Sequence, residues 1–419
     1  MRSLYTWLLY AALPWALARL WWRGRREPGY RDHVEERFGA SDLEPGARLL
    51  WVHAVSVGEV RASAPLVRAL QRAYGDHTLL VTCMTAAGRE AAKQVFGETA
   101  LVAYAPYDLP HAVRRFLDHF RPRLGVLMET EIWPNLIESC RVDGVPLMLA
   151  NARLSQRSAR RYLRFGRLAA RAFGTLSAAC VQGAADARRL RRLGARDVTI
   201  AGNLKFDVEP DPGKSAEGRA FRAALRHRKV LLLASTREGE EERLLAECVA
   251  VDPDALLVLV PRHPQRFDAV AAIAQRLGLS SARRSLAEAP HQGRRLYLGD
   301  TMGEMAFYYA LCDVAVIGGS FEPLGGQNLI EACAAGVPAV VGPHMFNFAD
   351  VTRLAVRAQA ALQVGDAHAA IEAARALLAD PARCASMGVA GKRLCARHQG
   401  ATVRHLDVCR RLLTARGPG

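Results

Sequence analysis

The chain has 419 residues, of which 50% are hydrophobic, and a formal net charge of +16. This length predicts about two domains, and the apolar content excludes a disordered protein. The positive charge indicates an affinity for anions, which include phosphorylated substrates, anionic lipid headgroups and nucleic acid. The nine cysteines occur singly, without a C-x-x-C pair, and predict reduced thiols rather than a disulfide framework or a zinc site.

The chain begins with an uncharged apolar stretch over residues 3–18, which is followed by arginines and tryptophans at 19–26. As a helix this stretch is roughly 24 Å long, slightly less than the ~30 Å hydrocarbon core of a bilayer. The flanking arginines and tryptophans are typical of a cytoplasmic membrane interface. We therefore predict an uncleaved membrane anchor over residues 1–26, with the rest of the chain in the cytoplasm. A cleaved signal peptide and a buried amphipathic helix are the alternatives.

Short apolar runs then alternate with helical patterns. Strands are expected at 49–55, 78–84, 100–106, 124–129, 146–152, 178–183 and 198–203, with helices over stretches such as 61–74, 85–96 and 109–120. A Pro- and Gly-containing linker at 209–216 interrupts the pattern, which restarts with strands at 230–235, 255–261, 295–300, 314–319 and 338–343. Apolar strands separated by helices indicate parallel sheets covered on both faces. We predict an α/β protein with two Rossmann-like domains, over 27–208 and 217–419, and a cleft between them.

Ligands of such sheets bind beyond the carboxyl ends of the strands. Glu59 follows the first strand and belongs to a Ser56-x-x-Glu59 capping box, which would explain it structurally. Its place at a strand end also suits a general base, and a helix N-terminus should help to keep its carboxylate charged. Glu129 and Glu131 follow the fourth strand, where they either interact as paired carboxylates or cap the next helix. Lys205 follows the seventh strand and either meets an anionic group of a substrate or is a solvated side chain.

The second half carries polar residues at comparable places. Arg237 and Arg262 follow two strands and could bind a phosphate, although single arginines are common in this chain. Gly325 and Gly326 are expected to open a helix that carries Glu331, which would offer backbone N–H groups to a phosphate and a carboxylate to a ribose. Ordinary packing between a strand and a helix is the alternative.

Two further patterns bear on ligands. The string Asp252-Pro-Asp254 is the only one that resembles a metal-binding D-x-D, but it precedes a strand and is better explained as a turn. We therefore predict no essential metal and no cofactor. A single helix over 155–173 is expected to place most of its six arginines on one face, as a contact for a membrane surface or an anionic substrate; a solvated helix face is the alternative.

Taken together, these motifs resemble those of the 3-deoxy-D-manno-octulosonic acid (Kdo) transferases of Gram-negative bacteria. Besides the N-terminal segment, the resemblance rests on the ordered strings HAVSVGE, METEIWPNLI, NARLSQRS, GNLKFD, STREGEE, LVPRHPQRF and GDTMGEM and on the region up to GPHMFNF. It implies a GT-B fold, in which two Rossmann-like domains face a cleft. It also implies an inverting, metal-independent transfer of Kdo from CMP-Kdo to the lipid A precursor lipid IVA, at the cytoplasmic face of the inner membrane.

The resemblance also implies roles for individual residues. Glu59 matches the general base, and Glu129 and Lys205 match positions that stabilise the transition state in the acceptor-side domain. In the second domain, the residues that match the CMP site are Pro261, Arg262, Met302, Gly303, Glu304, Asn328, Leu329, Ile330 and Glu331, to which we add Arg237 and Gly326. The expected partners are CMP-Kdo, lipid IVA and an anionic membrane surface, without nucleic acid.

Two other functions remain open from the sequence. One is another GT-B enzyme of envelope synthesis, either a UDP-sugar transferase or a sugar-nucleotide epimerase. The other is a basic, membrane-tethered nucleic-acid-binding protein, against which the sequence lacks aromatic RNA-binding strings and a helix-turn-helix pattern.

Overall fold

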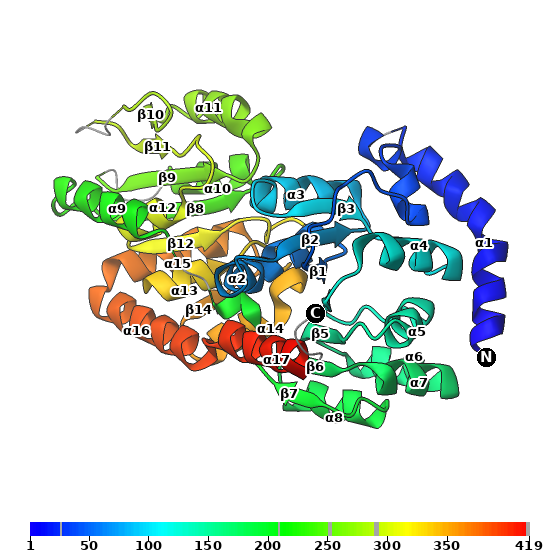
Figure 1. The fold of residues 1–419 in the computed structure, drawn as a ribbon. Helices are drawn as coiled ribbons and strands as arrows, with labels where there is room; N and C mark the ends of the chain where they lie inside the picture. Colours follow the sequence, from blue (N-terminus) through cyan, green and yellow to red (C-terminus); the bar gives the residue numbers. More distant parts are fainter. Residues whose placement is uncertain (26, 208–209, 250–253, 289–292, 416–419) are drawn as a thin grey trace. The chain divides into compact units, whose positions relative to one another are not determined.

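The computed structural model describes residues 1–25, 27–207, 210–249, 254–288 and 293–415, and the chain divides into two compact units. Unit 1 comprises Met1–Asp207 together with Gln399–Gly419, and unit 2 comprises Val208–His398. Each unit is built around one parallel sheet with helices, as Figure 1 shows. The prediction of two Rossmann-like domains is therefore confirmed.

The sheet of unit 1 has seven parallel strands in the order β3-β2-β1-β4-β5-β6-β7. Its strands are β1 (Leu49–His53), β2 (Thr78–Cys83), β3 (Leu101–Tyr104), β4 (Leu124–Met128), β5 (Leu147–Ala152), β6 (Ala178–Val181) and β7 (Val198–Ile200). Successive side chains of β1 point to opposite faces. Leu50 and Val52 therefore join one hydrophobic core cluster, while Leu49 and Trp51 join the other. This two-sided burial explains why the strand is apolar throughout.

Helices from both ends of the chain supply the remaining surfaces of these cores. They are α2 (Val57–Ala73), α3 (Ala86–Phe96), α4 (Pro110–Phe120), α5 (Pro134–Val142), α6 (Gln156–Arg164), α7 (Arg167–Thr175), α8 (Ala184–Arg192) and α17 (Ala401–Ala415), with 3-10 turns η1 (Pro28–Tyr30), η2 (Val34–Phe38) and η3 (Leu204–Phe206). Residues of α2, α3 and α17 contribute to one cluster, and residues of α4, α5, α7 and α8 to the other.

The sheet of unit 2 also has seven parallel strands, in the order β10-β11-β9-β8-β12-β13-β14. The strands are β8 (Val230–Thr236), β9 (Leu256–Pro261), β10 (Ser281–Arg283), β11 (Leu296–Leu298), β12 (Val314–Ile317), β13 (Ala339–Val341) and β14 (Ala361–Gln363). The helices are α9 (Pro212–Ala224), α10 (Glu241–Cys248), α11 (Phe267–Arg276), α12 (Met305–Leu311), α13 (Ile330–Ala335), α14 (Ala349–Arg357), α15 (Ala367–Ala379) and α16 (Pro381–His398), with η4 (Pro264–Arg266) and η5 (Phe346–Phe348). Strands β10 and β14, of three residues each, were not predicted.

The N-terminal segment forms helix α1 (Arg2–Arg23), and none of its residues is buried. The alternative of a buried core helix is therefore wrong. One face of α1 contacts α4, α5 and the loop before α4: Tyr5 donates a hydrogen bond to Asp108 at 2.9 Å, and Thr6 donates one to Asn135 at 3.1 Å. Among the described residues, no helix is both long and apolar enough to cross a bilayer. Residues 1–26 belong to unit 1 rather than forming a separate domain.

Two other predicted boundaries differ from the structure. The chain returns to unit 1 at Gln399, so the second unit does not extend to residue 419; buried residues such as His405 and Cys409 attach α17 to the first core. Most of the predicted linker is helical, because α9 begins at Pro212, where the Asp211 side chain accepts a hydrogen bond from the backbone N–H of Lys214 at 2.9 Å. Residues 208–209 lie outside the described residues.

The predicted arginine helix is also broken. Its first part, α6, ends at Arg164, and α7 starts after Gly166, whose φ of +48° favours a residue without a side chain. The six arginines therefore do not share one continuous helix face. One of them, Arg171, donates a hydrogen bond to the carboxylate of Glu138 at 2.9 Å.

Candidate active site

Two candidate residues of unit 1 lie where the strand order reverses. Strands β1 and β4 are neighbours, although two strands separate them in the chain. Their following segments diverge at this switch point, which in open α/β sheets is the usual ligand position. Glu59 lies in the first turn of α2 after β1, and Glu129 follows the last residue of β4. The topology thus brings together two carboxylates that are seventy residues apart in sequence.

Glu59 forms the capping box that the sequence predicted. Its carboxylate accepts hydrogen bonds from the backbone N–H of Val55 at 2.9 Å and from the hydroxyl of Ser56 at 3.0 Å. Burial nevertheless raises the pKa of Glu59 to about 7, and the nearby carboxylate of Glu129 adds to this effect. The hydrogen bonds from Val55 and Ser56 at the helix N-terminus do favour the charged form of Glu59, but desolvation outweighs them. A carboxyl group with a pKa near neutrality is well matched to accepting a proton during a reaction.

The Glu59 carboxylate interacts electrostatically with three charged residues, Glu129, Glu131 and Lys205. Glu129 has φ of +56°, and its backbone N–H donates to the carbonyl of Ala150 at 2.8 Å. Burial raises the pKa of Glu131, whose carboxylate accepts a hydrogen bond from the indole of Trp133 at 2.8 Å. Burial lowers the pKa of Lys205, against the opposing influence of Glu129 and Glu59. Lys205 is thus a partly desolvated cation coupled to both predicted catalytic acids, rather than a fully solvated side chain.

Unit 2 repeats this arrangement at its own switch point, between β8 and β12. Arg237 follows β8, and Arg262 follows β9, whose last residue is Pro261. The buried carboxylate of Glu240 connects the turns after β8 and β12, since it accepts hydrogen bonds from the backbone N–H groups of Arg237 at 2.8 Å and Gly319 at 2.5 Å. The side chain of Glu240 therefore holds the arginine-bearing turn against the glycine turn.

The glycine pair takes a different place from the predicted one. Gly325 and Gly326 have φ of +92° and +76°, but helix α13 begins four residues later, at Ile330. A Cβ atom on Gly326 would lie 2.1 Å from the sulfur of Met345, so a side chain here would displace that methionine, and the positive φ favours glycine as well. The pair shapes a loop before the helix and does not form the helix N-terminus itself.

The residues after the glycine pair divide into half-buried polar members and fully buried apolar members. Asn328 accepts a hydrogen bond from the backbone N–H of Ile330 at 3.1 Å and donates one to the carboxylate of Glu331 at 2.9 Å. Leu329 and Ile330 have fully buried side chains. Of the four predicted CMP-site residues here, only Asn328 and Glu331 offer polar side chains, while the other two support the loop from the core.

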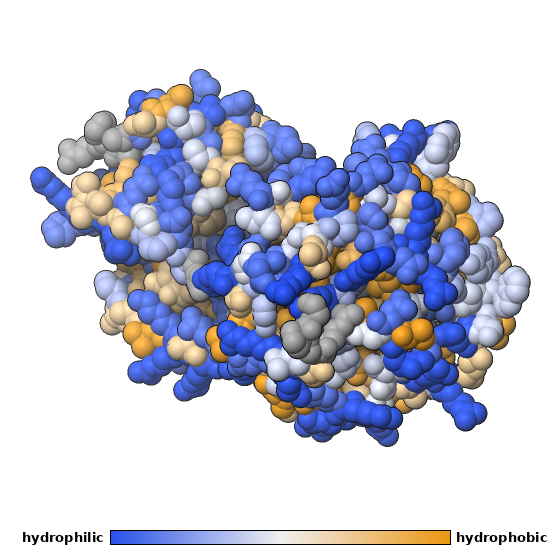
Figure 2. Space-filling view, viewed as in Figure 1, coloured by the Kyte–Doolittle hydropathy of each residue, from blue (hydrophilic) through white to orange (hydrophobic). Residues whose placement is uncertain are grey.

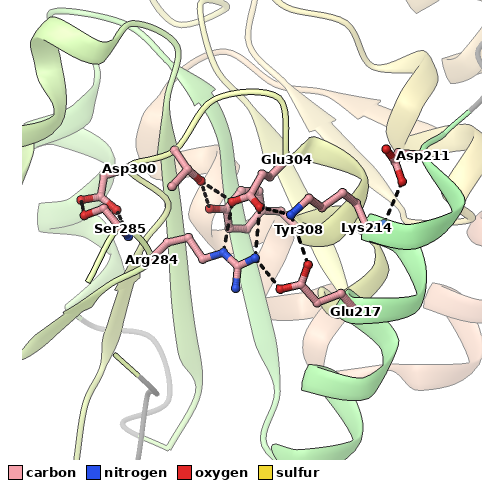
Figure 3. Close-up of polar contacts among 9 residues, drawn as sticks. Asp211, Lys214, Glu217, Arg284, Ser285, Asp300, Glu304 and Tyr308 are labelled. Carbon is pink, nitrogen blue, oxygen red and sulfur yellow. Dashed lines mark hydrogen bonds and ion pairs between the residues drawn. The ribbon is translucent and has the colours of Figure 1, made fainter. Parts of the chain in front are cut away.

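Glu304 lies at the centre of an ion-pair network, shown in Figure 3. Its carboxylate accepts hydrogen bonds from Arg284 at 3.0 Å and from Lys214 at 2.5 Å, as well as from the hydroxyl of Thr301. The hydrogen bonds from Arg284, followed by those from Lys214 and Thr301, lower the pKa of Glu304 to about 2. Glu217 accepts a further hydrogen bond from Arg284 at 2.5 Å.

This network changes the interpretation of the loop. The carboxylate of Glu304 is hydrogen-bonded to two protein cations, which fixes the loop, while its predicted contact with CMP stays a prediction. Met302 and Gly303 are exposed in that same loop, and Gly303 has φ of +81° with open space around it. In this loop, Met302 and Gly303 are the residues that are accessible to solvent.

Sequence reasoning missed the supporting residues Glu240, Lys214 and Arg284. Glu240 had a signal, since it belongs to the string STREGEE at a strand end, where we considered only Arg237. Lys214 and Arg284 had none, because they are far from Glu304 in sequence and only the fold brings them to it.

Known proteins with similar sequences align with nearly the whole chain, and thus with both units. Residues 32–208 match the family described as 3-deoxy-D-manno-octulosonic-acid transferase (kdotransferase), and residues 285–394 match the group 1 glycosyl transferases. The 3-deoxy-D-manno-octulosonic acid transferase of Bordetella pertussis is 44% identical over 97% of this chain and 98% of its own length. The chain belongs to the Kdo transferase family. The corresponding transferase of Haemophilus influenzae is 35% identical over 97% of both chains.

The protein is therefore a glycosyltransferase that transfers Kdo, an activity of lipopolysaccharide core biosynthesis. A crystal structure of a glycosyltransferase from Rickettsia africae resembles this Kdo transferase in fold, with a TM-score of 0.55 over 88% of this chain and 99% of that chain at 11% identity. With two parallel Rossmann-like sheets, the fold is of the GT-B type, as predicted.

Two predicted features concern metals and thiols. Among the described residues, no group of three or more His, Cys, Asp or Glu side chains could hold a metal ion. Asp252 of the D-x-D string lies outside the described residues. Metal independence stays a prediction.

All nine cysteines have free thiols, and burial raises the pKa of most of them, which makes them poor nucleophiles.

Proposed function

We propose that this Kdo transferase moves Kdo from CMP-Kdo to a hydroxyl of lipid IVA, with inversion at the anomeric carbon and without a metal. The observation that carries the proposal is the half-buried Glu59 at the switch point of unit 1, electrostatically coupled to Glu129 and Lys205, with burial raising its pKa to about 7. A carboxylate of this kind can take a proton from an alcohol at neutral pH.

The reaction needs one base and one stabilised leaving group. Glu59 accepts the proton of the acceptor hydroxyl, while the oxygen of that hydroxyl forms the bond to the anomeric carbon of Kdo. The bond between that carbon and the phosphate oxygen breaks, and its electron pair leaves with CMP. Lys205 supplies positive charge for the carboxylate of the sugar, and Glu129 keeps this lysine charged by raising its pKa against the effect of burial. One-step displacement from the face opposite the leaving group accounts for inversion.

Unit 2 supplies the donor site in this proposal. Arg237 and Arg262 follow neighbouring strands and offer planar guanidinium groups for the phosphate of CMP. The exposed part of the loop around Gly303 and the side chains of Asn328 and Glu331 are the candidates for contacts with the ribose and the base. Binding of the leaving group by arginines stabilises the charge that develops on its phosphate.

The direct test is product analysis with labelled CMP-Kdo and lipid IVA. We expect Kdo-bearing lipid from the wild-type protein and about 10²- to 10⁴-fold slower formation by Glu59→Gln, while CMP raises the melting temperature of both proteins. Protection by UDP instead of CMP would point to a UDP-sugar enzyme and refute the donor assignment. Near-normal turnover by Glu59→Gln would show that this residue is only a helix cap.

We further propose that α1 attaches the protein to the anionic cytoplasmic face of the inner membrane. Its outer face exposes large apolar side chains, with Trp7 73% and Trp15 66% exposed. Figure 2 shows pale to orange residues mixed with hydrophilic ones along the right-hand edge, where α1 lies in Figure 1. Arg19 stacks on Trp15 at 5.4 Å, and this pairing of aromatic and basic side chains is typical of membrane interfaces.

Vesicle sedimentation tests this attachment. We expect binding to vesicles that contain phosphatidylglycerol, weakened about tenfold in a Trp7→Ser, Trp15→Ser double variant, which loses roughly 1.4 kcal/mol or more of apolar contact. Val403→Ser is the matched control, since Val403 is also an exposed apolar residue, 59% exposed, but lies on α17. Equal binding by the double variant and the control would refute a role for α1.

A further inference from the structure

The C-terminal helix α17 packs on the catalytic unit through a buried face. Its residues Leu406, Cys409 and Leu413 belong to the same core cluster as residues of β1 and β4, and His405 is buried on the same helix. The helix also lies next to the 3-10 turn η3, which carries Lys205. Core packing alone would explain the apolar members of this face, but it does not explain a fully buried histidine among them.

The segment around Lys205 is bound by α17 on both sides. At one side, Arg404 donates a hydrogen bond from its Nε to the carbonyl of Ala201 at 2.7 Å. At the other side, the carboxylate of Asp207 accepts hydrogen bonds from the backbone N–H groups of Gly400 at 2.8 Å and Thr402 at 2.5 Å. The start of the C-terminal helix therefore fixes both ends of the short segment that contains η3.

His405 adds a third connection, which leads to the centre of the turn. Its Nδ1 lies 2.7 Å from the carbonyl oxygen of Ala401, so Nδ1 carries the proton and donates it. Its Nε2 is then an acceptor, and it accepts the backbone N–H of Asn151 at 2.9 Å. Acceptance at Nε2 requires the neutral imidazole, in agreement with burial, which lowers the pKa of His405 to about 4.

Asn151 links His405 to the turn that carries Lys205. Its φ of +55° is a left-handed conformation that asparagine tolerates better than most residues, and it directs the backbone N–H toward His405. The side-chain oxygen of Asn151 accepts the backbone N–H of Leu204 at 3.1 Å. Leu204 directly precedes Lys205, so two hydrogen bonds and one residue separate the imidazole from the backbone of the lysine.

We propose that His405 is a positioning residue for catalysis, which acts through Asn151 to fix the turn that presents Lys205 beside Glu129 and Glu59. The inference rests on the proposed function, because it assumes that the charge of Lys205 contributes to transfer. The C-terminal helix is then part of the catalytic apparatus of unit 1, although almost two hundred residues separate it from Lys205 in sequence.

Two substitutions of similar size separate the hydrogen bond from the packing. His405→Gln keeps an acceptor close to the place of Nε2, whereas His405→Met fills the same space without a comparable one. We expect His405→Met to lower kcat for CMP-Kdo and lipid IVA about 10- to 100-fold, with less than a twofold change in the KM for CMP-Kdo, because small misplacements of a catalytic group cost rate. His405→Gln should recover most of the lost kcat.

A matched control and a double-mutant cycle complete the test. Leu413→Ala removes a buried side chain of the same helix that makes no hydrogen bond to the turn, so it should lower the melting temperature and leave kcat near wild type. In a Lys205→Met background, His405→Met should have no further effect on kcat, because both changes act at one point.

The outcomes distinguish this inference from the proposed function. If Lys205→Met turns over like wild type, the proposed role of the lysine fails. If Lys205→Met is impaired but His405→Met is not, the positioning role alone is refuted. It is also refuted if His405→Gln is as slow as His405→Met, or if Leu413→Ala loses as much kcat, since either result would show a purely structural histidine.

Discussion

The substitution Glu59→Gln should alter activity and stability in different ways. It removes the proton acceptor, and since general bases typically contribute 10²- to 10⁴-fold, transfer should fall by about that factor. Because the pKa of Glu59 is about 7, the kcat/KM of the wild type should decrease as the pH falls below about 7, where the carboxylate becomes protonated.

The stability effect follows from the same pKa. Its rise from 4.5 to about 7 means that the charged carboxylate is disfavoured in the folded state by about 3 kcal/mol. The favourable contribution of the protonated group is present below pH 4.5 and is lost as the pH rises through 7, so the free energy of unfolding should decrease over this range. Glutamine cannot ionise and escapes this loss.

Glutamine also weakens the capping box. It has one carbonyl oxygen in place of two carboxylate oxygens, so one acceptor is lost among the bonds to Val55 and Ser56, at a cost of about 1 kcal/mol. The variant should therefore be less stable than wild type by about 1 kcal/mol near pH 4.5. Near pH 8 it should be more stable by about 2 kcal/mol, since the penalty on the charge exceeds the lost bond.

Urea denaturation followed at pH 5, 6, 7 and 8 measures this crossover. The control is Glu90→Gln on the exposed surface of α3, which should differ from wild type by a constant small amount at every pH. If Glu59→Gln also differs from wild type by a constant amount, burial does not raise the pKa of Glu59, and the argument for a base matched to neutral pH falls.

Three further results are expected. Gly326→Ala should cost about 1–3 kcal/mol more than Gly144→Ala, since both have positive φ but only the first would clash with a neighbouring side chain; equal losses in thermal unfolding would contradict this. Glu304→Gln should lower the free energy of unfolding by about 2 kcal/mol and weaken the protection by CMP. The control Glu372→Gln, in an exposed ion pair, should lower it by under about 1 kcal/mol. Equal losses in the two variants would show that the Glu304 network is not structural. Since burial lowers the pKa of His53 to about 4, stability should fall as the pH drops from 6.5 to 4, and the slope should flatten in His53→Gln; an unchanged slope would refute this cause.

The sequence by itself determined the architecture and the family. Apolar runs such as Leu49–His53 have no polar face, which is possible only where helices cover both sides of a parallel strand. The rule that ligands bind at the carboxyl ends of strands selected Glu59, Glu129 and Lys205 without any coordinates. The proximity of Glu59 and Glu129 follows from the neighbouring strands β1 and β4, whereas Lys205 comes from the segment after the edge strand β7.

Only the tertiary structure decided the environment of these groups. A helix N-terminus and burial act on Glu59 with opposite signs, and the balance depends on neighbours that no local pattern reveals. The partners of Glu304 come from Lys214 and Arg284, and the support of the Lys205 turn comes from His405 at the far end of the chain. Side-chain spacing along a strand or helix encodes which face is buried, whereas the identity of a partner across the fold is set by packing between distant segments. For that reason most strands and the ligand-binding ends of the sheets were predictable, and the strand order and the charges and hydrogen bonds around the site were not.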